Sequence, residues 1–501
     1  MFRQASLSDP IRRVREVLGV GDLLAVVVAL SALGAVAAAV TVGVRTDRLA
    51  TIAVLSVAFP VVLVSMRWPM VPLFAFAAMI PIESVLVIGD LGTVSKFAGI
   101  LFAVVYGVPR LGRLTLGAMP AVAWAYVAWA LVSMGWAIDS STSWSELSTL
   151  LQLFIIAVLI ADVVAHRPTV VRQLLWIYSV SAAVTGLIGI EAFVTSADVT
   201  GGRVAALQNQ DPAQFAALLL PALVFSFYEV LNRRRVLLGV LVALMSLAGI
   251  VVSGTRGAWL SVALVILLFI LPRLRLAQLV AAVGVLGLLV IVTLQLPGVS
   301  DLVAQRADTA LSSGGAGRTD IWSVAVKIYE ESPVLGVGYA NFPVAYTNDL
   351  VRATDVGTYS INNPQGRGPH NIVIGTVAEL GPFGLLLLAC FLIPLILRPG
   401  WGPDGISVQA CLASLLTAAL FLDVLSNSKQ VWLVVGLAAG LTYVARRRPL
   451  AVPAKDVGPA TSSSRPSIAP GVSGSSVPRT PWTRQTPRRG RSKRYEPGRG
   501  S

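Results

Sequence analysis

Long apolar runs alternate with short polar or arginine-bearing breaks along most of this chain. Many of these runs reach roughly 17–25 residues, the length that an α-helix needs to cross the apolar core of a bilayer. A backbone in lipid must satisfy its hydrogen bonds internally, so such runs are expected to be helices. The predicted spans are residues 20–44, 49–66, 70–88, 97–108, 117–138, 147–165, 170–194, 213–231, 236–253, 257–272, 276–296, 371–397, 405–425 and 430–445. The pattern therefore predicts an all-α integral membrane protein, a polytopic bundle of about 12–14 transmembrane helices.

Arginines fall mainly in alternate gaps between these spans. The gaps concerned hold Arg67, Arg110 with Arg113, Arg167 with Arg172, Arg233 to Arg235, Arg273 with Arg275, Arg398, and Arg446 to Arg448. The positive-inside rule assigns these gaps and both termini to the cytoplasm. Arg45 and Arg48 lie in a gap of the opposite kind and break the rule.

One gap assigned to the extracytoplasmic side, residues 297–370, is much longer than the others. It divides the predicted membrane region into residues 20–296 and C-terminal helices at residues 371–445. A loop of this length with little internal structure is usually functional rather than a simple connector. Residues 1–19 form a predicted cytoplasmic segment without a cleavage site.

One part of the long loop has a helical pattern. In the stretch TDIWSVAVKIYE, apolar side chains recur at helical spacing, and a Thr/Asp start signal precedes them. The apolar positions are Ile321, Trp322, Ala325, Ile328 and Tyr329. We expect an amphipathic helix that lies along the membrane surface.

Composition supports a membrane class and explains the charge. Hydrophobic residues make up 55% of the chain and charged residues 13%, which is outside the range of ordinary soluble domains. The net charge is +14, but residues 446–501 contain eleven arginines and two lysines against two acidic residues. The membrane region is therefore close to neutral, and no nucleic-acid partner is expected. The tail over residues 446–501 is rich in Pro, Ser, Gly and Arg and is predicted to be disordered in the cytoplasm.

Three arginines, Arg203, Arg256 and Arg318, are predicted to lie on the extracytoplasmic side. Arg256 is in a turn so short that it stays at the membrane boundary, where an arginine is costly unless it is paired or meets an anion. A guanidinium gives two parallel hydrogen bonds to phosphate oxygens, so two or three of these residues could hold a diphosphate. The alternative is that they reach toward lipid head groups or pair with aspartates.

His370, one of two histidines, is predicted to lie on the same side. It follows Pro369 and opens the helix that returns to the bilayer, where the positive helix end favours a neutral imidazole. A neutral ring is what a general base for a sugar hydroxyl requires. The alternative is a polar residue at a membrane boundary. The other histidine, His166, is predicted to be cytoplasmic.

Acidic residues provide supporting candidates but no metal site. Glu379 and Asp423 lie in predicted spans near the outer face and could orient His370 or an arginine. Pairing between helices is an equally good explanation for both. The sequence has no Asp-x-Asp, no GxxxxGK[ST] loop and no HExxH, the usual ligands of nucleotide-sugar, ATP-driven and zinc-peptidase chemistry. We therefore expect no metal and no cofactor.

Four motifs occur in a fixed order around the long loop: SGTRGAW, GRTDIW, SPVLGVGYANF and PHNIVIGTVAELGPFG. In this order they resemble the O-antigen ligase and polymerase family of bacterial membrane glycosyltransferases. The resemblance extends from about Arg203 to Lys429. It implies a metal-independent, inverting transferase of the bacterial plasma membrane. Such an enzyme moves a glycan from a polyprenyl diphosphate carrier to a glycan, glycolipid or protein acceptor outside the cytoplasm.

The resemblance also implies roles for individual residues. Arg256 and Arg203 would bind the diphosphate and Arg318 would support it, while His370 would deprotonate the acceptor hydroxyl. Trp322 belongs to the GRTDIW motif and is a possible supporting residue. Ligases, polymerases and protein glycosyltransferases share these motifs, so the acceptor stays open. A transporter or flippase of lipid-linked glycans, and a structural scaffold, are the alternative functions.

Overall fold

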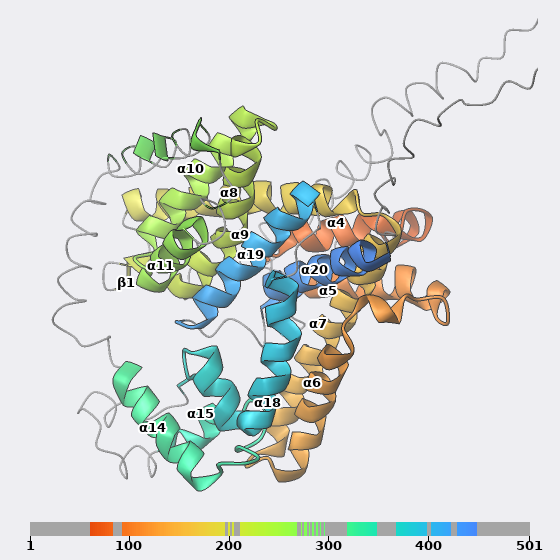
Figure 1. Cartoon of the computed structure of the whole chain (residues 1–501), viewed down its shortest axis with the longest axis vertical. Coiled ribbons are helices and arrows are strands. Elements are labelled where there is room, and N and C mark those ends of the chain that lie inside the picture. The colour runs from red at the N-terminus through yellow and green to blue at the C-terminus, as the bar shows by residue number, and fades with distance from the viewer. Residues whose placement is uncertain are drawn as a thin grey trace, which may run out of the picture. The chain divides into compact units, whose positions relative to one another are not determined.

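A computed structural model describes most of the membrane region of the chain. The described residues are 61–83, 93–195, 199–200, 203–204, 211–267, scattered positions within 272–295, and 318–347, 367–397, 402–421 and 428–447. The first half contains α4 (Met70–Met79), α5 (Val94–Phe102), η3 (Ala103–Gly107), η4 (Val108–Arg110), η5 (Leu116–Ala118), α6 (Ala121–Val132), η6 (Ser133–Trp136), α7 (Ser140–His166) and α8 (Val170–Thr195). There follow β1 (Val199–Thr200), β2 (Arg203–Val204), α9 (Pro212–Leu231), α10 (Val236–Val252), α11 (Arg256–Val265), α14 (Arg318–Glu331), α15 (Phe342–Ala345), α18 (Ile372–Leu397), α19 (Gly402–Ala419) and α20 (Lys429–Arg447). The structure is helical apart from β1 and β2, which pair as one antiparallel ladder (Figure 1).

The predicted fold class, an all-α polytopic membrane protein, is confirmed. Among the described helices, α7, α8, α9 and α18 are long and apolar enough to cross a membrane, and several shorter apolar helices accompany them. Helices α8, α9 and α10 begin and end within one residue of the predicted spans, whereas α4 ends at Met79 rather than residue 88 and α7 begins at Ser140 rather than residue 147. The predicted segments at residues 1–19 and 20–44, and the tail from residue 448 onward, lie outside the described residues.

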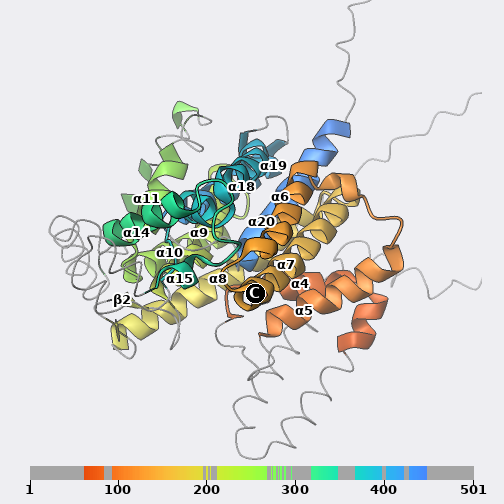
Figure 2. The same ribbon diagram turned by 90° about the horizontal axis from the view of Figure 1, so that it is seen from below.

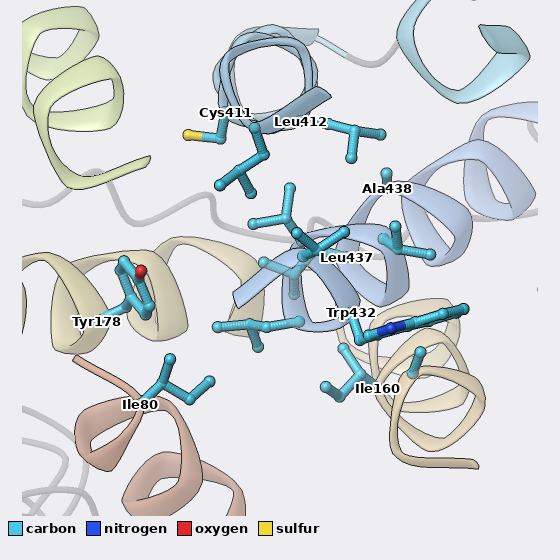
Figure 3. Close-up of a cluster of buried hydrophobic side chains, with 14 of the residues drawn as sticks. Ile80, Ile160, Tyr178, Cys411, Leu412, Trp432, Leu437 and Ala438 are labelled. Atoms are coloured by element: carbon cyan, nitrogen blue, oxygen red, sulfur yellow. The ribbon is translucent and has the colours of Figure 1, made fainter. Parts of the chain in front are cut away.

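The apolar core is a continuous cluster of buried side chains that come from most of the described helices. Helix α20 packs along α7, and α8, α9 and α10 pack against one another. Figure 2 shows α6, α7 and α20 side by side. Figure 3 shows the centre of this core, where Tyr178, Cys411, Trp432 and Ile160 come from α8, α19, α20 and α7 respectively. All four side chains are buried, so close packing of side chains holds these helices together.

Several ionisable side chains form contacts near the ends of the helices. At the end predicted to be cytoplasmic, Asp162 accepts hydrogen bonds from the Tyr106 hydroxyl (2.7 Å) and the Thr115 amide (2.7 Å). At the same predicted end, Arg172 pairs with the buried Glu229. These contacts join helix ends that the arginine pattern assigned to the same side of the membrane. Which end faces the cytoplasm stays a prediction.

Candidate active site

His370 lies in a backbone turn directly before α18. Its φ angle is 47°, the left-handed region that non-glycine residues rarely adopt. The N-cap of α18 is the next residue, Asn371, whose Oδ1 accepts from the amides of Val373 (2.9 Å) and Ile374 (3.1 Å). The sequence predicted that His370 itself opens the helix, but asparagine is the better cap because its side chain satisfies two free amides. His370 therefore lies just outside the positive end of α18 and is partly exposed.

The amphipathic helix predicted in the long loop is present as α14. Its buried face consists of Ile321, Val324, Ala325 and Ile328. We expected this face to lie on the membrane surface, but it packs against α18 and the segment around α15, which offer apolar partners within the protein (Figure 1).

This packing brings one motif residue of α14, Trp322, to the start of α18. The Trp322 Nε1–H donates to the carbonyl of Pro369, the residue before His370, at 3.3 Å. Arg318 begins α14 and precedes Trp322 by four residues, so both lie on one side of the helix. The structure therefore places Trp322 against the residue before His370, and Arg318 lies one turn before Trp322 on α14.

Helix α18 is broken at Gly381, where φ is 70° and ψ is −178°, and Pro382 follows. A proline removes an amide donor and leaves carbonyls of the preceding turn without their usual helical partners. Other parts of the chain bind them: the Val337 amide donates to Ala378 O (2.9 Å) and the Gly338 amide to Glu379 O (2.9 Å). The Trp129 indole of α6 donates to the next carbonyl, that of Leu380 (3.0 Å). The motif SPVLGVGYANF is thus the segment that covers the break in α18.

Glu379 also holds this segment through its side chain. Its Oε1 accepts from the amide of Phe342, the first residue of α15, at 3.2 Å. We predicted that Glu379 could orient His370 or an arginine, and that role stays a prediction. The observed contact is a carboxylate at the N-terminus of a short helix, where a negative charge is favourable.

Asn341 ties the same segment to the junction between η6 and α7. Its buried amide group donates to Ser143 Oγ (2.6 Å), and its Oδ1 accepts from the Asp139 amide (2.7 Å). Asp139 caps α7 and accepts hydrogen bonds from Thr142 and Ser141, which hold the pKa of its carboxyl below its usual range. The carboxylate therefore stays ionised at neutral pH and keeps the start of α7 fixed. Sequence reasoning missed Asn341, because its partners lie about 200 residues away along the chain.

The turn that carries Arg256 is built against a different set of helices. Arg256 is the first residue of α11, and Thr255 before it donates through its hydroxyl to the carbonyl of Pro212 at the start of α9 (3.2 Å). The next residue, Gly257, lies against Phe421, two residues after the end of α19. The Arg256 side chain is partly buried, and it makes no hydrogen bond or ion pair to any residue that the structure describes.

The remaining candidates are described only in part. The backbone of Arg203 lies in β2, where it pairs with Thr200 of β1. Asp423 lies outside the described residues. The acidic residue Glu83 forms an ion pair with Lys429, whose Nζ also donates to Thr93 Oγ1 (2.9 Å). Glu83 therefore serves to join α20 to the α4–α5 region, a pairing that no local sequence signal revealed.

Residues 240–389 match the sequence model of the O-antigen ligase family. The chain carries an O-antigen ligase domain. This domain confirms the predicted resemblance over the matched residues, which include Arg256, Arg318, Trp322, His370 and Glu379. A comparison with curated proteins finds no match to the chain.

The O-antigen ligase domain includes both parts of the candidate site, the surroundings of His370 and the turn of Arg256. Residues outside the match also contact this region, because the Trp129 indole binds the carbonyl of Leu380 at the α18 break and the Asp139 amide binds Asn341 in the segment that covers the break. The family is one of membrane glycosyltransferases, and its members take a lipid-linked glycan donor and an acceptor. Among the described residues, no group of three or more His, Cys, Asp or Glu side chains is arranged to hold a metal ion.

Proposed function

We propose that this chain transfers a glycan from a polyprenyl diphosphate carrier to an acceptor hydroxyl on the extracytoplasmic face of the membrane. In this reaction the acceptor O–H bond breaks and its proton passes to the imidazole of His370. The acceptor oxygen attacks the anomeric carbon, and the bond from that carbon to the diphosphate breaks with inversion. The departing diphosphate carries the added negative charge, which Arg256 neutralises with support from Arg203 and Arg318.

The observation that carries this proposal is that Arg256 is partly buried and has no anionic partner among the described residues. A partly buried arginine at a membrane boundary is costly without an anion, yet none of the described residues supplies one to it. The residue also begins α11, where free backbone amides and the helix dipole favour an anionic ligand. A diphosphate suits both features, because a guanidinium binds its oxygens in pairs.

The surroundings of His370 support its role as the base. The residue is partly exposed, and Trp322 of α14 donates to the carbonyl of the residue before it. A neutral imidazole within reach of a hydroxyl suits proton removal near neutral pH. The acceptor stays open among the classes that the family uses.

The test is transfer by the purified chain in nanodiscs. The donor is the lipid-linked glycan that accumulates in cells lacking this chain, and the readout is release of free polyprenyl diphosphate together with a glycosylated acceptor. Release that depends on the acceptor supports the proposal. Movement of the donor between leaflets without transfer would instead support the transporter alternative.

Replacing Arg256 by lysine should weaken donor binding and slow transfer together. The ammonium of lysine keeps the positive charge but loses the paired hydrogen bonds to phosphate oxygens. A loss of about 1.5–3 kcal/mol, typical of a hydrogen bond to a charged group, corresponds to roughly tenfold or more in affinity. Binding is measured with polyprenyl diphosphate that carries no glycan, and the initial transfer rate is measured in the same preparation.

Arg113→Lys is the matched control, because Arg113 is exposed and lies at the opposite predicted end of the bundle. This variant should bind polyprenyl diphosphate and transfer glycan at the unsubstituted rate. Unchanged donor binding by Arg256→Lys would remove Arg256 from the diphosphate site.

Transfer should also survive chelation. The proposed charge neutralisation uses arginines, so the rate in EDTA should equal the rate without it. Loss of transfer in EDTA, followed by recovery with Mg²⁺ or Mn²⁺, would show that a metal ion neutralises part of the diphosphate charge.

A further inference from the structure

The backbone of His370 is held in its rare conformation from both sides. A left-handed φ of 47° at a residue with a side chain persists only where the surroundings determine it. On the C-terminal side, Asn371 is fixed because its side chain caps the first turn of α18 with two hydrogen bonds. The orientation of His370 then depends on how the preceding residue, Pro369, is fixed.

Two contacts fix Pro369, and neither involves His370 directly. The buried proline ring lies over Gly375, one turn into α18, where an added Cβ would come within 2.6 Å of Pro369 Cγ. Glycine at position 375 is therefore required for this close approach. The second contact is the hydrogen bond from the Trp322 Nε1–H to the Pro369 carbonyl at 3.3 Å. That carbonyl belongs to the peptide group that joins Pro369 to His370, and a peptide group is planar, so the indole also sets the direction of the His370 amide.

We propose that Trp322 and Gly375 are positioning residues that act on His370 through Pro369. The inference rests on the proposed function of His370 as the base. Trp322 holds the carbonyl and Gly375 admits the ring, so the imidazole is placed before the acceptor arrives. A displacement of about 1 Å at a reacting group can reduce a rate by as much as 10²-fold, so this support should appear in turnover rather than in donor binding.

The test removes the indole N–H and keeps an aromatic ring. In nanodiscs, Trp322→Phe should lower kcat about tenfold, which is part of the loss that a displacement of about 1 Å can cause. The KM for the lipid-linked donor should stay within about twofold of the value for the unsubstituted chain. The matched control is Trp176→Phe, since the Trp176 indole also donates one hydrogen bond of 3.3 Å, to Glu229 Oε2, at the end of the bundle predicted to be cytoplasmic. The control should keep a normal kcat.

A second comparison separates positioning from general structural support. In a His370→Ala background, Trp322→Phe should cause no further loss, because the group that Trp322 positions is already absent. An equal loss in both backgrounds would overturn the proposal, as would a normal kcat, a rise in donor KM alone, or an equal loss in Trp176→Phe. Should Trp322→Phe fail to fold, Gly375→Ala is measured in the same way. A lower kcat that disappears in the His370→Ala background would support the proposal, and an equal loss in both backgrounds would contradict it.

The same experiment distinguishes the two levels of inference. Normal transfer by His370→Ala would contradict the proposed function itself. Slow transfer by His370→Ala together with normal transfer by Trp322→Phe and Gly375→Ala would contradict only the positioning roles.

Discussion

Replacing His370 by alanine is expected to lower the rate of glycan transfer by about 10²–10⁴-fold, the usual contribution of a general base. The variant has no group at this position to take the acceptor proton, so the hydroxyl must react while it is still protonated. Binding of polyprenyl diphosphate should barely change, because the arginines that bind the anion are intact. Initial rates and donor binding are measured across pH in one nanodisc preparation.

The chain contains its own control, because it has only one other histidine. His166 ends α7, where its Nδ1 lies 2.8 Å from the Asp162 carbonyl, at the end of the bundle predicted to be cytoplasmic. His166→Ala should therefore transfer at a nearly normal rate. Higher pH should partly rescue a His370→Gln variant, since a more ionised acceptor needs less help from a base. Near-normal turnover by His370→Ala would leave His370 as a polar residue at the membrane boundary.

The helices could be predicted from sequence because lipid leaves the backbone few alternatives. A run such as residues 147–165 must be helical in an apolar core, and α7 indeed covers it. The helix α14 was also predictable, since its apolar positions recur with a helical period. Its location was not, because the same apolar face fits either a membrane surface or the side of α18.

The break in α18 shows what a local pattern cannot predict. The sequence favoured one continuous span over residues 371–397, although Gly381 and Pro382 lie inside it. A break is stable only where other groups bind the freed carbonyls, and here these groups are the amides of Val337 and Gly338 and the indole of Trp129. None of these partners is adjacent in sequence, so the break depends on tertiary contacts that the pattern does not contain.

The candidate site was predicted in its residue types but not in its arrangement. The motifs indicated Arg256, Arg318 and His370 because their chemistry suits a diphosphate and a hydroxyl. The structure adds that Trp322 of α14 contacts the residue before His370, whereas Arg256 belongs to the α9, α11 and α19 group. Contacts such as those of Asn341 link the first group to α7, which lies outside the O-antigen ligase match.

Replacing Gly381 by alanine is expected to detach the segment that covers the α18 break and to abolish most transfer. With φ at 70° and ψ at −178°, the residue adopts a conformation open in practice to glycine alone, at a cost on the order of 1–3 kcal/mol for other residues. An added Cβ would also lie 2.0 Å from the carbonyl oxygen of Val334. The backbone cannot retreat without losing the hydrogen bonds of Val337 and Gly338 to α18. Limited proteolysis at residues 332–347 and the transfer rate are measured on the purified variant.

Gly135→Ala is the matched control for this change. Gly135 lies in η6, near the same segment, but no heavy atom lies within 4 Å of an added Cβ and its φ is not in the left-handed region. This variant should resist proteolysis and transfer glycan like the unsubstituted chain. Gly381→Ala should instead expose residues 332–347 while α7 and α20, which pack along each other away from the break, remain protected. An intact segment with normal transfer in Gly381→Ala would mean that α18 can straighten at this point, and that the break is not needed to hold His370.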